Sequence, residues 1–165
     1  MNKDLLLSLS GKFIRVDRGG PESREGKLLA VGSDYFTILT EDDGVVYYKM
    51  QHVKSITVDT KSNLSQEAGP EKVELYQGED FKSVIKNFRH SWVKVNRGGP
   101  EKLEGILNEV DDDYVTIISK QEVIQLAMFH IRNISFGAKS EEEGNSEDGK
   151  SKGNSNSKSS GNRRR

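Results

Sequence analysis

Short runs of β-branched and aromatic residues recur along the first 138 residues, and Gly, Pro, Asp and Ser separate them. This alternation of apolar runs and turn residues is typical of antiparallel strands. A helical spacing of apolar positions is found at Phe81, Val84, Ile85 and Phe88, directly after Asp80, a favourable N-cap residue. Strands are predicted at 13–16, 25–31, 35–40, 45–49 and 53–58, and at the matching positions further along the chain. The alternation of Val73, Leu75 and Tyr76 adds an optional edge strand.

An internal repeat organises this pattern. Residues 12–40 return at 91–119 with fourteen of twenty-nine positions identical, and MQHVKSITV at 50–58 returns as MFHIRNISF at 128–136 after a one-residue deletion. A fixed period of this kind indicates a tandem duplication of one small domain. The organisation predicted is a first β-barrel repeat at 1–58, a linker at 59–78, a second repeat at 79–138 and a tail at 139–165.

Each repeat combines one short helix with about five strands, and in the first repeat Leu5, Leu6 and Leu9 hold the helical positions. We therefore expect a mainly β protein with two separate small antiparallel barrels of the Sm-like or SH3-like kind, each with a short N-terminal helix. Matching apolar positions should be buried in both repeats, namely Phe13/Trp92, Val16/Val95, Leu28/Leu107, Val31/Val110, Ile38/Ile117 and Ile56/Ile134.

Composition separates the body of the chain from its end. Residues 139–165 carry no apolar side chain, so this tail is predicted to be disordered, and the absence of cysteine rules out disulfide bonds. The tail holds seven of the basic and five of the acidic residues, which leaves the body with a net charge of −3. Its cations follow its acids, and those expected to bind anions are Lys150, Lys152, Lys158, Arg163, Arg164 and Arg165.

The motif RGGPE occurs once in each repeat and is the strongest candidate for a recognition loop. Its residues are Arg18, Gly19, Gly20, Pro21 and Glu22 in the first repeat, and Arg97, Gly98, Gly99, Pro100 and Glu101 in the second. Arginine pairs with carboxylates or phosphates in a bidentate geometry. A purely architectural interpretation carries more weight, because glycine and proline already suit a bent hairpin.

Metal binding and catalysis find little support in the sequence. His52 and His130 occupy matching positions before the last strand of each repeat, where a hydrogen bond to the backbone is the expected role, and His90 stands alone. Asp111, Asp112 and Asp113 are interpreted as an exposed turn. We predict no metal site, no cofactor and no enzymatic activity.

The two RGGPE motifs, together with GKL-x-x-V-x-x-DY at 26–35 and YYKMQHVKSI at 47–56, resemble the spore coat protein B family of Bacillus-type endospore formers. The resemblance covers residues 1–138. It implies a structural component of the outer spore coat, made in the mother cell cytoplasm, with other coat proteins as partners.

Two functions of different classes follow from the sequence. In the first, the barrels join coat proteins or further copies of the chain through exposed edge strands, and the tail binds silica or another polyanion. In the second, the repeats form an Sm-like RNA-binding module. The acidic body argues against nucleic acid as a partner, and no apolar run is long enough for a membrane span.

Overall fold

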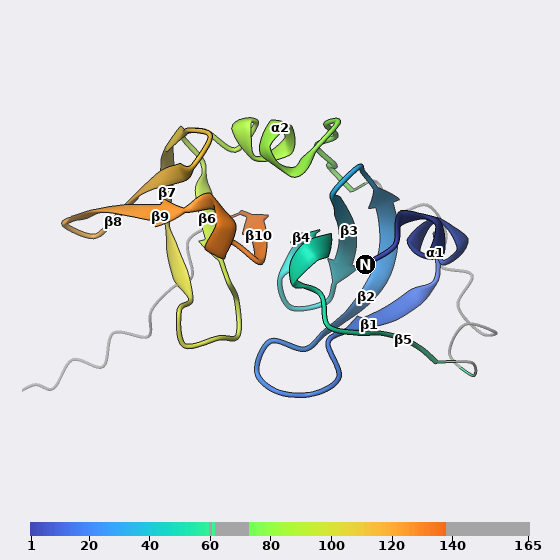
Figure 1. The fold of residues 1–165 in the computed structure, drawn as a ribbon. Coiled ribbons are helices and arrows are strands. Elements are labelled where there is room, and N and C mark those ends of the chain that lie inside the picture. Colours follow the sequence, from blue (N-terminus) through green and yellow to red (C-terminus); the bar gives the residue numbers. More distant parts are fainter. Residues whose placement is uncertain (60, 62–72, 138–165) are drawn as a thin grey trace, which may run out of the picture.

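The fold is built almost entirely from strands. Figure 1 shows the computed structural model of the chain, which describes residues 1–59, 61 and 73–137. The tail and most of the expected linker lie outside the described residues. The helices are α1 (Lys3–Ser8) and α2 (Phe81–Lys86); the strands are β1 (Phe13–Val16), β2 (Arg24–Val31), β3 (Tyr35–Thr40), β4 (Gly44–Lys49), β5 (Ile56–Val58), β6 (Trp92–Val95), β7 (Leu103–Val110), β8 (Tyr114–Ser119), β9 (Glu122–Ala127) and β10 (Asn133–Phe136).

All ten strands belong to one antiparallel sheet with the order β5-β1-β2-β3-β4-β10-β6-β7-β8-β9. The two repeats contribute five strands each in the same relative order. They are joined where β4 pairs with β10, with Tyr47 opposite Ile134 and Val46 opposite Ser135. Among the described residues, no pairing joins β5 to β4 or β10 to β9, so neither set of five strands closes on itself.

The prediction of a mainly β protein is confirmed, but the two separate barrels are not observed. Strand β4 would be an open edge if the repeats were separate, with unpaired amides and carbonyls. Its outward side chains include Val45 and Tyr47, which would then be exposed to water. Pairing with β10 satisfies the backbone groups and buries these side chains in one step, so the sheet runs continuously through both repeats.

The hydrophobic core is divided into two clusters that do not coincide with the repeats. The first lies inside repeat 1 and is built around Leu28, Phe36 and Ile38. The second fills repeat 2 and also includes Tyr35, Val45 and Tyr47 from repeat 1. The second core is therefore completed by side chains of the first repeat.

Burial of the matched apolar pairs is only partly confirmed. Both members of Val16/Val95, Leu28/Leu107 and Ile38/Ile117 are buried, and so is Ile134. The other predicted core positions are half-buried, although Val31, Ile56 and Val110 pack against the two cores; these positions are Phe13, Trp92, Val31, Val110 and Ile56.

Both predicted helices are observed, but each ends before the last apolar position assigned to it, Leu9 in repeat 1 and Phe88 in repeat 2. Asp80 caps α2 and accepts a hydrogen bond from the Ser83 amide at 2.7 Å, and Phe81, Val84 and Ile85 are buried. Residues 73–76 form no strand and instead pack their apolar side chains on the second core. None of the helices in the described residues is long and apolar enough to cross a membrane. Helix α2 lies on one side of the junction between the repeats, and the β1–β2 and β6–β7 loops lie on the other (Figure 1).

Candidate functional site

The two RGGPE motifs form the β1–β2 and β6–β7 loops, which we call the first and second RGGPE loops. Each loop begins at a residue in the left-handed backbone region, Asp17 at φ 54° and Asn96 at φ 53°. The side chain of each residue accepts a hydrogen bond of 2.7 Å from a backbone amide of the segment that leads into the last strand of its repeat, Lys54 N for Asp17 and Arg132 N for Asn96. These two side chains fix the loops on the sheet.

The two loops touch each other at the junction between the repeats. A Cβ atom built on Gly98 would lie 1.8 Å from the carbonyl oxygen of Pro21, and Gly98 also has a φ of 89°. Glu22 of the first loop forms an ion pair of 2.5 Å with Arg132 of repeat 2. The loops therefore meet through backbone contact that tolerates only glycine at position 98.

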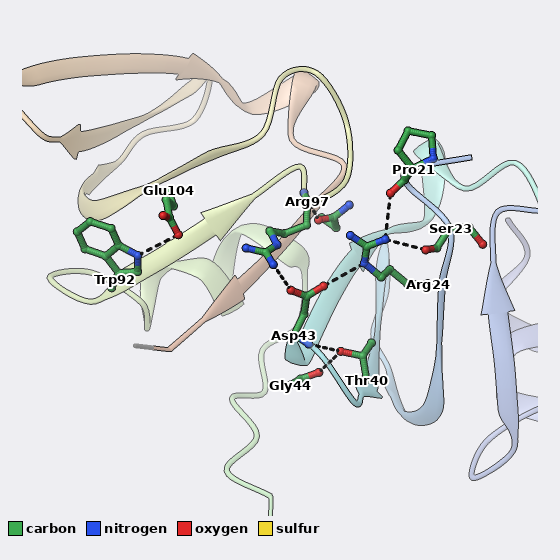
Figure 2. Close-up of polar contacts among 10 residues, drawn as sticks. Pro21, Ser23, Arg24, Thr40, Asp43, Gly44, Trp92, Arg97 and Glu104 are labelled. Carbon is green, nitrogen blue, oxygen red and sulfur yellow. Dashed lines mark hydrogen bonds and ion pairs between the residues drawn. The ribbon is translucent and has the colours of Figure 1, made fainter. Parts of the chain in front are cut away.

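A buried carboxylate links the repeats beside these loops. Asp43, whose side chain is 2% exposed, lies between Arg24 of β2 at 3.0 Å and Arg97 of the second RGGPE loop at 2.5 Å. Arg24 also donates to the carbonyl oxygens of Pro21 and Ser23 (Figure 2). Because the two guanidinium groups come from different repeats, Asp43 connects the first loop, the second loop and the β3–β4 turn.

The two arginines predicted as recognition residues have different surroundings. The Arg97 side chain takes part in the ion pair with Asp43. Arg18 is exposed, and its amide donates to the Ser55 hydroxyl at 3.0 Å. A surface hollow of about 460 Å³ opens beside Arg18; it is lined by Asp17, Arg18, Gly19, Gly20, Pro21, Glu22, Lys54, Ser55 and Arg132.

The remaining predicted loop residues have different degrees of exposure. Gly99 is buried against the Glu22 carboxylate, whereas Pro100 and Glu101 are exposed. The structure thus brings together Pro21, Glu22, Gly98 and Gly99 at the junction. It leaves Arg18 and Glu101 on the surface. The six tail cations lie outside the described residues.

Tyr35 of β3 and the outward side chains of β4 make contacts that the sequence interpretation missed. The Tyr35 hydroxyl donates to Gly78 O at 2.9 Å, and the Tyr47 hydroxyl accepts from the Tyr76 amide at 2.9 Å. Lys49 is buried, donates to Met128 O at 2.5 Å and lies 5.2 Å from the centre of the Phe81 ring. Burial lowers the pKa of Lys49 below its usual value.

A signal for this buried strand was present in the sequence. The run Val45-Val46-Tyr47-Tyr48 is apolar or aromatic without interruption, whereas a strand with one solvated face alternates. Its counterpart, 123–126, reads Val-Ile-Gln-Leu and does include a polar position.

The histidines and aspartates of residues 1–59 and 73–137 do not cluster as metal ligands would. His52 bonds to the Phe129 carbonyl oxygen at 2.6 Å, as expected for a histidine that contacts backbone, and burial lowers its pKa. Within the residues that the structure describes, no group of three His, Asp or Glu side chains is arranged to hold a metal ion. At the junction, the charged side chains form ion pairs with one another and so hold segments of the chain together.

Comparison with curated proteins finds a clear similarity. The chain is 40% identical over 135 residues to spore coat protein B of Bacillus subtilis strain 168. The match covers 82% of this chain and 35% of the relative, so the chain spans about a third of the length of that protein. No protein-family model and no solved structure matches the chain.

Proposed function

Because the chain belongs to the spore coat protein B family, we propose that it is a structural component of the outer spore coat, made in the mother cell cytoplasm. The observation that carries this proposal is the 40% identity over 135 residues, which span most of the chain. The two repeats share one continuous sheet and together join neighbouring coat proteins.

The sheet supports such a joining role. Its two ends are β5 and β9, and in the described residues each of these strands pairs on one side only. Edge strands present backbone donors and acceptors that another chain can pair with. The junction of β4 with β10 is an example, within this molecule, of two such edges joined.

Localisation during sporulation tests the coat role. A fluorescent fusion should be made late, in the mother cell, and should encircle the forespore, and the protein should then be extracted with the outer coat layers. A matched fusion of the fluorescent protein alone serves as the control. Constitutive synthesis, or a signal that stays in the mother cell cytoplasm, would contradict the proposal.

The basic end of the tail extends the proposal to mineral or polymer binding. Residues 150–165 hold six cations, no acids and five serines, a composition suited to polyanions such as silica with deprotonated silanols. Many copies on one surface would strengthen a weak contact through avidity. Deletion of 150–165 should abolish silica binding by the purified protein at low salt, whereas equal binding by both forms would exclude this role.

RNA binding by the repeats has weaker support than the coat role. The body of the chain is net acidic, and RNA-binding domains of this size are generally basic. A salt-dependent gel shift that survives deletion of 150–165 would favour RNA binding instead. A catalytic role is not proposed.

A further inference from the structure

Strands β4 and β9 are counterparts in the duplication, yet their outward faces differ in exposure. Val45, Tyr47 and Lys49 on β4 are buried, because repeat 2 covers them. The corresponding residues on β9, namely Val123, Gln125 and Ala127, are exposed, and Val123 is 69% exposed. The outward face of this strand is thus covered by protein in repeat 1 and exposed in repeat 2.

An apolar row continues this open face across the outer surface of repeat 2. Ile106 of β7 pairs with Ile118 of β8, which pairs with Val123 of β9, and the first two are 41% and 37% exposed. We call these three residues the β9 face. In repeat 1 the counterparts of Ile118 and Val123 are Leu39 and Val45, and both pack against the second core.

The backbone of β9 is oriented to accept another strand. In the junction, the Lys49 amide donates to Arg132 O at 3.0 Å. Hydrogen-bonded positions alternate along an antiparallel pair, so the amides of Tyr47 and Val45 also face β10. At the equivalent positions of β9, the amides of Ala127, Gln125 and Val123 point away from β8, to the edge that pairs with no strand in the part of the chain that the structure describes.

The opposite end of the molecule carries the surface that would fit there. In repeat 2 the residues Phe88, Ile131 and Ile134 are fully buried in the second core, to which repeat 1 contributes Tyr35, Val45 and Tyr47. Their counterparts in repeat 1 are Leu9, Val53 and Ile56, which are only half-buried. With Val58 of β5, the counterpart of Phe136, they form what we call the open face of repeat 1.

Charge at the two ends is complementary. At the junction, the turn before β3 contacts the start of α2, where the Phe81 amide donates to Asp34 at 2.7 Å. The corresponding turn before β8 consists of three exposed aspartates, Asp111 to Asp113, of which Asp112 forms an ion pair with Lys82 of α2, so the charge of this turn is already partly balanced within repeat 2. The residue at the start of α1 that corresponds to Lys82 is Lys3, an exposed cation that would approach this turn in a second copy.

We propose that a second copy of this chain docks its β5 edge and the open face of repeat 1 on β9 and the β9 face, so that the sheet continues from one chain into the next. Val58 of one copy would then lie beside Val123 of the other, as Phe136 lies beside Val45 within the chain. The two docking surfaces differ from each other. A complex of any number of chains therefore keeps one unoccupied surface of each kind, and the assembly grows head to tail. This inference rests on the assembly role proposed above.

Sedimentation velocity of the purified full chain over a wide range of concentrations tests the proposal. The unmodified protein should form species larger than a dimer as concentration rises, also at high salt, where contacts of the charged tail are screened. Val123→Lys places a charge on the edge and should weaken self-association roughly tenfold or more, a change of about 1.4 kcal/mol or greater. Leu7→Lys is the matched control, since Leu7 is an exposed apolar residue on α1 whose counterpart is already Lys86.

A mixing experiment identifies the two surfaces. Val58→Lys should also block growth, and an equimolar mixture of Val58→Lys and Val123→Lys chains should stop at a one-to-one complex, because one intact surface of each kind remains. Circular-dichroism melting checks that each variant is folded. Val123 is so exposed that its replacement leaves the core intact. If Val58→Lys unfolds at a lower temperature, the result for Val123→Lys is sufficient to test the proposal.

Three results would overturn the inference. These are an unmodified chain that stays monomeric, a chain that stops at a dimer, which indicates like surfaces pairing, and a Val123→Lys chain that assembles as the unmodified chain does. Each would leave the coat role standing, because that role is tested separately by localisation around the forespore. A failed localisation would remove the coat role without changing these measurements.

Discussion

Gly19 and Gly98 hold the same place in the two RGGPE loops, and both have positive φ, 81° and 89°. Their surroundings differ, because a Cβ atom on Gly19 meets nothing within 4 Å, whereas one on Gly98 would collide with the Pro21 carbonyl group. Glycine is thus needed at position 19 for its backbone conformation alone. At position 98 it is needed both for conformation and for the close contact between the two loops.

This difference predicts unequal costs for the same substitution. Gly19→Ala should lower the free energy of unfolding by about 1 kcal/mol through the left-handed backbone alone. Gly98→Ala should cost about 3 kcal/mol or more, because the loops must also move apart. Urea denaturation of both variants measures the difference, and equal costs would show that the loops do not press on each other.

Asp43 is the residue whose polar contacts cross the junction most directly. Asp43→Asn removes the charge that faces Arg24 and Arg97, and we expect a loss of about 1–3 kcal/mol in the free energy of unfolding. Asp42→Asn is the control, because Asp42 is an exposed neighbour in the same turn. Denaturation curves that coincide for the two variants would mean that the bridge contributes nothing.

At the scale of the element, β4 is buried on both faces, and the titration of its tyrosines reflects this. Burial raises the pKa of Tyr47 to about 12 and raises the pKa of Tyr48 as well. Folding therefore favours the neutral phenols. This contribution is complete below the unfolded value of about 10 and is lost as pH rises toward the folded-state pKa.

Tyr48→Phe should make the alkaline loss of stability shallower. Each phenol contributes up to about 1.4 kcal/mol per pH unit to the fall in the free energy of unfolding above pH 10. The Tyr48 hydroxyl is buried without a hydrogen-bond partner among the described residues, so the variant should be as stable as the parent at neutral pH. Tyr47→Phe is the comparison, because it loses the bond from Tyr76 and should cost about 1 kcal/mol already at neutral pH. Urea denaturation at several pH values measures these free energies of unfolding. An unchanged fall of the free energy above pH 10 for Tyr48→Phe would contradict the burial argument.

At the scale of the whole molecule, the second core uses side chains of both repeats, so we expect the repeats to unfold together. Leu28→Ala in repeat 1 and Leu107→Ala in repeat 2 should each cost about 2–5 kcal/mol. Trp92, the single tryptophan of the chain, reports on repeat 2 through its fluorescence. Leu28→Ala should therefore lower the midpoint seen by Trp92, and an unmoved midpoint would indicate independent repeats.

The sequence by itself determined most of the elements and showed the internal repeat. Turn residues, β-branched runs and the Asp80 cap indicate the strands and α2 because these signals act over a few neighbouring residues. Identity between the copies placed both RGGPE motifs in matching loops, and the observed β1–β2 and β6–β7 loops agree. The resemblance to the spore coat protein B family was also drawn from the sequence, and the 40% identity to a member of that family agrees with it.

Only the tertiary structure decided how the repeats combine. Backbone hydrogen bonds between strand edges are the same for every sequence, so the pattern along the chain did not specify that β4 meets β10. The same applies to Arg97, which matches Arg18 in the motif but lies beside Asp43 because that junction brings them together. Two copies of one motif acquired different surroundings, because a duplicated chain has one internal junction and two free ends.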